Sequence, residues 1–227
     1  MTPELSPTMR DYLAEIYRLA ERAPEGVNYV GTSALAEMVN VSAPAVNRMV
    51  TRLKELGLLH HEPYQGIKLT EAGRKAALRR LRMHRIAEAF LVDVMGFSWD
   101  EVYEEAYGMS SNMSEAIAQR MLEMAKHPVR CPHGEPIPDV DAGLPELDDV
   151  RLSEAEVDTH YTITRVLTRE PDRLQYLAAL GLVPGARLQL IHIAPFSGPM
   201  QLKVGNEYRI IGHNLAELIK VEAEHDG

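Results

Sequence analysis

Two side chains with metal-binding chemistry lie one helical turn apart in the middle of the chain. His84 and Glu88 are separated by four residues, within a stretch from Thr70 to about Met95 that is typical of one long helix. At this spacing an imidazole nitrogen and a carboxylate oxygen can point at one ion, and such donors suit Mn²⁺ or Fe²⁺. An exposed histidine and glutamate at the same spacing also occur as an ordinary surface contact. The pair alone therefore leaves both interpretations open.

A second stretch, residues 32–59, has the pattern of a helix-turn-helix. Apolar residues recur at helical spacing up to Val39, stop at residues 40–42, and resume from Val46. We expect Ser42 to cap the second helix through its hydroxyl, with Pro44 in the first turn, where no amide partner is needed. A plain helical hairpin with a solvated polar face is the alternative interpretation.

The residues that follow favour DNA binding. Gly57 ends the second helix, and two short strand-like runs flank a turn at residues 63–66, which predicts a winged helix. The exposed face of the second helix has side chains that can approach base edges in a major groove. We expect base contacts from Ser42, Pro44, Ala45, Asn47 and Arg48, and phosphate contacts from Arg52, Lys54 and Lys68.

The charge of the chain is divided unevenly along its 227 residues. The net charge is −9, yet residues 1–85 hold 13 Lys and Arg against 9 Asp and Glu, whereas residues 86–227 hold 11 against 24. The positive part coincides with the helix-turn-helix, as phosphate binding requires. Double-stranded operator DNA is therefore the expected partner, and no small-molecule substrate is expected.

The cysteine content, the apolar runs and the catalytic motifs of the sequence bear on the location of the protein and on whether it is an enzyme. Its single cysteine, Cys131, has no partner in the chain, and no apolar run approaches 18 residues. We expect a cytoplasmic protein that does not contact membranes. No Ser/His/Asp order, glycine-rich phosphate loop or pair of carboxylates in a catalytic context stands out, so we do not expect an enzyme.

The predicted fold is α+β, mainly helical with a small β domain. We expect a winged helix-turn-helix in residues 1–73, a helical dimerisation and metal-sensing domain in 74–140, a linker rich in Pro, Gly and acidic residues in 141–160, and a five-stranded SH3-like barrel in 161–227. The helical domain has too little apolar surface for a core of its own. A homodimer is expected because five of its apolar residues would be exposed in a monomer: Phe90, Leu91, Ile117, Met121 and Leu122.

The order of these elements resembles that of the metal-dependent repressors of the DtxR/MntR family, over nearly the whole chain. The motifs that carry the resemblance are Asp11-Tyr12-Leu13, Ser42-Ala43-Pro44-Ala45-Val46, Leu69-Thr70-Glu71-Ala72-Gly73, His84-Arg85-Ile86-Ala87-Glu88, residues 131–138 (CPHGEPIP) and residues 180–185 (LGLVPG). The resemblance implies a dimeric repressor of metal-uptake genes that binds Mn²⁺ or Fe²⁺, with an SH3-like domain of the FeoA type at its C-terminus.

The resemblance also implies particular metal ligands. His84 and Glu88 match two ligands of the family's ancillary site, and Glu170 matches the carboxylate that the third domain extends toward it. Asp11 matches an N-terminal ligand of the primary site in manganese-type members. In the family, the segment that holds Cys131 and His133 has a structural role, although both side chains have ligand chemistry.

Other positions depart from the family pattern. Tyr103 replaces a histidine, and Tyr107, Ser110 and Ser111 stand where the family supplies Cys or Glu, Glu and His. Neutral hydroxyls are poor ligands for Mn²⁺ or Fe²⁺, so the primary site is expected to be altered. The acidic pair at 104–105 is an alternative source of ligands. A regulator that needs no metal, or a metal-binding adaptor that does not bind DNA, is the alternative function.

Overall fold

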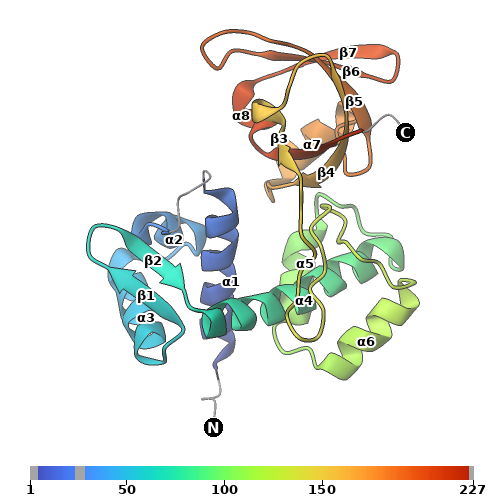
Figure 1. The fold of residues 1–227 in the computed structure, drawn as a ribbon. Helices are drawn as coiled ribbons and strands as arrows, with labels where there is room; N and C mark the ends of the chain where they lie inside the picture. Colours follow the sequence, from blue (N-terminus) through green and yellow to red (C-terminus); the bar gives the residue numbers. More distant parts are fainter. Residues whose placement is uncertain (1–4, 24–28, 225–227) are drawn as a thin grey trace. The chain divides into compact units, whose positions relative to one another are not determined.

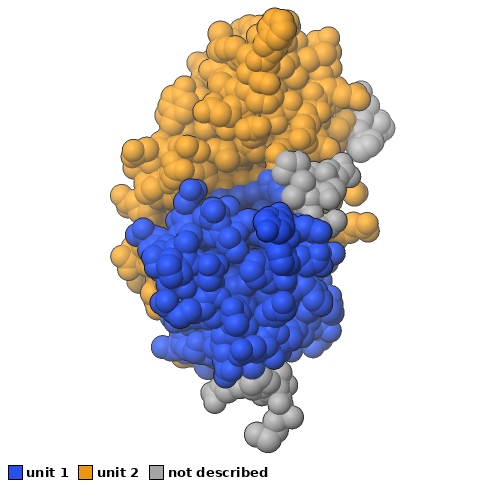
Figure 2. All heavy atoms as spheres, turned by 90° about the vertical axis from the view of Figure 1, so that its left-hand side faces the viewer, with its two compact units in different colours: residues 1–84, 109–115, 138–144 blue, residues 85–108, 116–137, 145–227 orange. Residues whose placement is uncertain are grey.

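The computed structural model describes residues 5–23 and 29–224 of the chain. These residues form two compact units, which Figure 2 shows in two colours. The first unit comprises residues 1–84, 109–115 and 138–144, and the second comprises residues 85–108, 116–137 and 145–227. Within the described part of the chain, no helix is long and apolar enough to cross a membrane.

Three helices begin the first unit (Figure 1): α1 (Pro7–Arg22), α2 (Thr32–Met38) and α3 (Ala43–Glu55). Apolar residues that recur at helical spacing bury one face of each helix in a shared core, which includes Leu13, Ile16, Leu35, Val46, Val50 and Leu53. The expected helix-turn-helix corresponds to α2 and α3.

The cap of α3 differs from our expectation. Ser42 precedes the helix in an extended conformation, but among the described residues its hydroxyl caps no amide. Its backbone carbonyl instead accepts the amide hydrogens of Ala45 and Val46. The prediction of a hydroxyl cap was therefore wrong, and the side chain of Ser42 is left exposed at the start of α3.

A two-stranded wing follows α3. Strands β1 (Leu59–Glu62) and β2 (Gly66–Leu69) pair antiparallel. Gly57 ends α3 in the left-handed region, with φ of 70°, as its sequence position indicated. Gly66 is required at the wing because an added Cβ would lie 2.4 Å from the carbonyl oxygen of Val30.

Helix α4 (Glu71–Asp93) is a single helix of 23 residues that belongs to the first unit as far as His84 and to the second unit beyond it. Thr70 caps it as expected, because its hydroxyl accepts the amide hydrogen of Gly73 at 3.1 Å. Part of its basic half points inward. Arg82 is buried, donating to Glu115 at 2.9 Å and to the carbonyl oxygen of Pro138 at 2.8 Å.

Two shorter helices follow, α5 (Val102–Ser110) and α6 (Glu115–Met124). Leu91 and Leu122 are only 2% and 8% exposed in the single chain, so the expectation that a monomer would expose them was wrong. Both side chains are therefore covered within the single chain, without a second subunit. Ile117 is 53% exposed, as expected.

The C-terminal part is a sheet of six strands in the order β3-β8-β4-β5-β6-β7 (Figure 1). Its strands are β3 (Val150–Arg151), β4 (Thr159–Val166), β5 (Arg187–Ile193), β6 (Met200–Val204), β7 (Glu207–Ile211) and β8 (Ile219–Ala223). The helices α7 (Pro171–Ala179) and α8 (His213–Ala216) connect them. The sheet encloses a core that includes Ile163, Leu174, Leu190, Leu202 and Val221.

Strands β4 to β8 account for the five strands expected in the C-terminal barrel. The sixth, β3, and the short 3-10 helix Leu152–Glu154 lie within the segment 141–160 that we expected to be a linker. A strand of two residues is too short to show alternation in the sequence. The predicted fold class, helical with a small C-terminal β domain, is confirmed.

Candidate functional site

The exposed face of α3 presents the residues that the sequence assigned to base contacts. Ser42, Pro44, Asn47 and Arg48 are exposed, whereas Ala45 is partly buried. The opposite face of the helix is fixed in the core by Val46, Val50 and Leu53. A rigid helix with one polar face and small residues at its N-terminus has the shape and chemistry to enter a major groove.

The residues assigned to phosphate contacts are also exposed, but two of them have partners within the protein. Arg52 forms an exposed ion pair with Glu55 at 3.2 Å, and Lys54 donates to the carbonyl oxygen of His61 at 3.4 Å. Such surface contacts are weak and exchange readily with a phosphate. Lys68 lies on β2 of the wing. The tip of the wing carries Tyr64, which is fully exposed and which the sequence reasoning did not include.

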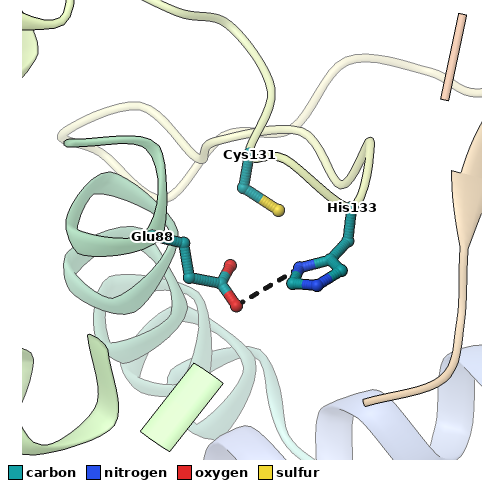
Figure 3. A group of neighbouring side chains, drawn as sticks. All are labelled: Glu88, Cys131 and His133. Atoms are coloured by element: carbon teal, nitrogen blue, oxygen red, sulfur yellow. Dashed lines mark ion pairs between the residues drawn. The ribbon is translucent and has the colours of Figure 1, made fainter. Parts of the chain in front are cut away.

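A buried cluster of three potential metal ligands lies in the second unit. Among the described residues, Glu88, Cys131 and His133 form the one group of at least three His, Cys, Asp or Glu side chains whose ligand atoms all lie within 4.8 Å of one another. Glu88 projects from α4, and the other two project from the loop that faces it (Figure 3). All three side chains are buried.

The loop that carries Cys131 and His133 is held in a tight turn. The amide of Gly134 donates to the carbonyl of Cys131 at 2.8 Å, and the amide of Cys131 donates to the carbonyl of Glu135 at 2.9 Å. Gly134 has φ of 84°, and an added Cβ would lie 2.0 Å from the carbonyl oxygen of Thr164 on β4. The turn brings the thiol and the imidazole to the side of the loop that faces Glu88.

The cluster is electrostatically coupled. His133 Nδ1 lies 3.4 Å from a carboxylate oxygen of Glu88, and His133 Nε2 lies 2.8 Å from the carbonyl oxygen of Trp99. A carbonyl can only accept, so Nε2 carries a hydrogen and Nδ1 is the atom directed toward Glu88. Burial lowers the pKa of His133, but the hydrogen bond and charge of Glu88 outweigh burial and raise it above 6.5.

The thiol of Cys131 is held in its protonated form. Burial, followed by the negative charge of Glu88, raises its pKa well above the usual value. A divalent ion would replace the proton of the thiol and any proton at Nδ1 of His133, because metal ligands must be deprotonated. One thiolate, one imidazole and one carboxylate form a borderline donor set that fits a first-row divalent ion such as Fe²⁺, because the soft thiolate suits Fe²⁺ better than the harder Mn²⁺.

Comparison with known proteins identifies the family. Three family models match consecutive parts of the chain: the N-terminal DNA-binding domain of iron-dependent repressors at residues 4–67, the metal-binding and dimerisation domain of iron-dependent repressors at 70–139, and the FeoA domain at 150–223. The iron-dependent repressor IdeR of Mycobacterium tuberculosis (strain ATCC 25618 / H37Rv) is 35% identical to the chain, over 96% of this chain and 98% of the relative. The chain belongs to the iron-dependent repressor family.

Solved structures agree with this assignment. A manganese-dependent transcriptional repressor in complex with manganese superposes with a TM-score of 0.88 at 30% identity, covering 95% of this chain and all of the other. The IdeR structure from T. acidophilum has a TM-score of 0.83 at 30% identity and covers 95% of this chain and 97% of the other. The predicted resemblance and the general function, a transcriptional regulator of a metal-dependent repressor family, are confirmed.

Within this repressor, the expected ligands are distributed over different environments. Four ligands were expected from the sequence: His84, Glu88, Glu170 and Asp11. Glu88 is the one of these four that lies in the buried cluster with Cys131 and His133. His84 is also buried, at 2% exposure, one turn before Glu88. Glu170 is 63% exposed and pairs with Arg173 at 2.8 Å, and Asp11 pairs with Arg80 at 2.6 Å. A metal-binding role for His84, Asp11 and Glu170 stays a prediction.

Two arginines contact the positions where the repressor departs from the family pattern. Arg169 donates to the hydroxyl of Tyr103 at 2.6 Å, and its guanidinium carbon lies 4.5 Å from the centre of that ring. Arg80 donates to Ser110 at 2.8 Å. Both hydroxyls therefore accept hydrogen bonds from a cationic side chain.

Cys131 and His133 were not expected from the sequence to be metal ligands. The signal was present, since a cysteine and a histidine two residues apart form a common ligand spacing. It was interpreted as structural because the segment CPHGEPIP has a structural role in the family that the sequence resembles, and the sequence does not show that the loop packs on α4 next to Glu88.

Proposed function

We propose that this protein is a metal-responsive transcriptional repressor that binds double-stranded operator DNA as a homodimer in the cytoplasm. The observation that carries the proposal is the buried Glu88, Cys131 and His133 cluster, in a chain whose helix-turn-helix has an exposed polar face. Relatives named as iron-dependent and manganese-dependent repressors support Fe²⁺ or Mn²⁺ as the effector.

The cluster provides a physical basis for metal response. Without an ion, the thiol of Cys131 and the imidazole of His133 retain protons, and the carboxylate of Glu88 forms an ion pair with His133 at 3.4 Å. When bound, a divalent ion supplies positive charge that cross-links the donors. The ion would then tie Glu88 on α4 to the loop of residues 131–135. This would shift the population of conformations toward those in which α4 is held against the loop at Glu88.

DNA recognition in this proposal belongs to α3. Arg48 can form a bidentate contact with a guanine, and Asn47 with an adenine, because their side chains are exposed on the face opposite the core. Arg52, Lys54 and Lys68 contact phosphates and set the position of the helix in the groove.

The proposed homodimer uses the apolar surface that the subunit leaves exposed near α5 and α6. Ile117, Met124 and Met95 are each more than half exposed. These residues lie in the part of the chain that matches the metal-binding and dimerisation domain of the family. Large exposed apolar side chains favour burial against a second copy. We expect Ile117→Asp to yield a folded monomer in sedimentation velocity, whereas an unchanged dimer would place the interface elsewhere.

The experiment that tests the function measures DNA affinity while metal is added. The metal-free protein is mixed with labelled DNA from the promoter region of its own gene, and Fe²⁺ under anaerobic conditions, Mn²⁺ or Zn²⁺ is titrated. We expect Fe²⁺ or Mn²⁺ to increase the affinity of the wild-type protein and not of Glu88→Gln. DNA binding unaffected by any metal would indicate a metal-independent regulator, and metal binding without DNA binding would indicate an adaptor.

A further inference from the structure

The first unit contains a nearly buried arginine that joins three separate segments. Arg80 on α4 has a side chain that is 5% exposed. Its Nε donates to a carboxylate oxygen of Asp11 on α1 at 2.6 Å, and one terminal nitrogen donates to Ser110 at the end of α5 at 2.8 Å. These partners lie 69 and 30 residues away in sequence.

The apolar contact beside this bridge is small. Ala14 on α1 packs with Leu78 and Leu81 on α4 and with Ala142, and these four residues form a separate buried cluster. Removing one partner of a nearly buried ion pair leaves the other charge unpaired and is strongly destabilising, so the position of α1 against α4 is sensitive to Arg80. Ser110 adds a favourable position for the guanidinium, because the carboxyl end of a helix carries partial negative charge.

We propose that Arg80 is a positioning residue for DNA binding. Its guanidinium serves as a permanent, covalently attached cation that anchors α1 of the winged helix to α4 and to the end of α5. A guanidinium does not lose its proton at any physiological pH, and no chelator can remove it. The anchorage of α1 therefore does not depend on a dissociable ion, and the proposed metal response is assigned to the Glu88 cluster.

The inference uses DNA binding as its readout and so rests on the proposed function. The two fail differently. If the wild-type protein does not bind its promoter DNA, the proposed function fails. If the wild type binds and the Arg80 variants bind equally well, only this inference fails.

The experiment compares Arg80→Met with Arg120→Met in the full-length protein. Both changes remove one positive charge, but Arg120 is 75% exposed on α6 and pairs only with its neighbour Glu123 among the ion pairs of the described residues. We expect Arg80→Met to weaken DNA binding about tenfold or more, equally in chelator and in saturating Mn²⁺, while Arg120→Met changes it less than about twofold.

Hydrogen exchange separates positioning from a general loss of stability. In Arg80→Met we expect faster amide exchange in α1 and in residues 109–115, and unchanged exchange in β4 and β5. Faster exchange everywhere, affinity within twofold of wild type in the folded variant, or full rescue by Mn²⁺ would each overturn the inference.

Arg80→Lys keeps the inference testable if the methionine variant does not fold. Lysine retains the charge next to Asp11 but lacks the planar fork that reaches two partners at once. We expect a folded protein whose DNA affinity is about three- to tenfold below wild type. Wild-type affinity in this variant would show that the bridge to Ser110 has no role in positioning, and would overturn the inference.

Discussion

Replacing Cys131 with serine removes the thiol from the Glu88 cluster while leaving the side chain nearly the same size. A serine hydroxyl does not ionise near neutral pH, so the variant retains one carboxylate and one imidazole as strong donors. Substitution of residues that merely support metal ligands costs about 10- to 100-fold in affinity, so loss of a direct ligand should cost at least about 100-fold, or about 2.7 kcal/mol.

The assay is isothermal titration of the metal-free protein with Mn²⁺ or Fe²⁺, in buffers that differ in ionisation enthalpy. These buffers reveal how many protons leave on binding. Because burial and Glu88 raise the pKa of the Cys131 thiol well above its usual value, its proton must be released when the thiolate binds. We expect Cys131→Ser to bind more weakly and to release fewer protons than wild type.

His84→Ala tests the sequence-based expectation that His84 is a ligand, since His84 is buried on the same helix one turn before Glu88. We expect it to retain metal affinity within about tenfold of wild type. If Cys131→Ser binds as wild type does and His84→Ala does not bind, the ion lies elsewhere on α4 and the assignment of the cluster is refuted.

Four further outcomes are expected. Arg48→Ala should cost about 1 to 3 kcal/mol on specific DNA in a mobility-shift titration and little on random DNA, and an equal loss on both would mean that it contacts only phosphate. Leu91→Asp should abolish cooperative thermal unfolding rather than merely separate dimers, because Leu91 is buried within the subunit; a folded monomer would contradict this. Burial raises the pKa of Asp149, but hydrogen bonds and charge from Arg165 outweigh burial and hold this pKa below 3.8, so the stabilisation is present above pH 3.8 and is lost as the pH falls through the pKa of the folded state. In urea unfolding at a series of pH values, Asp149→Asn should reduce the fall of the free energy of unfolding at acid pH, and an unchanged fall would count against this. Gly134→Ala should weaken Mn²⁺ binding, because its Cβ would collide with the carbonyl of Thr164, and calorimetry equal to wild type would show that the turn tolerates the change.

The sequence determined the local elements of this protein and their order. Helical periodicity predicted α2, α3 and α4, and strand-like runs predicted the wing and the five strands β4 to β8, because both patterns depend on neighbours within a few positions. Gly57 and Thr70 also acted as expected, since turns and caps are local. The polar face of α3 followed from the same periodicity.

Tertiary structure alone decided which distant groups meet. Whether Leu91 and Leu122 face solvent depends on what packs against them, and the periodicity of one helix cannot show that. The same holds for Ser42, whose exposed hydroxyl depends on the precise turn before α3.

The two sites of greatest interest depend on contacts between segments far apart in the chain. Glu88 reaches Cys131 and His133 because a tight turn at Gly134 places the loop against α4. Asp11 lies against Arg80 because α1 crosses α4 in the folded unit. A sequence supplies the chemistry of each side chain, but the distance between groups 40 or more residues apart is set by the packing of whole helices and loops, and only the folded chain contains it.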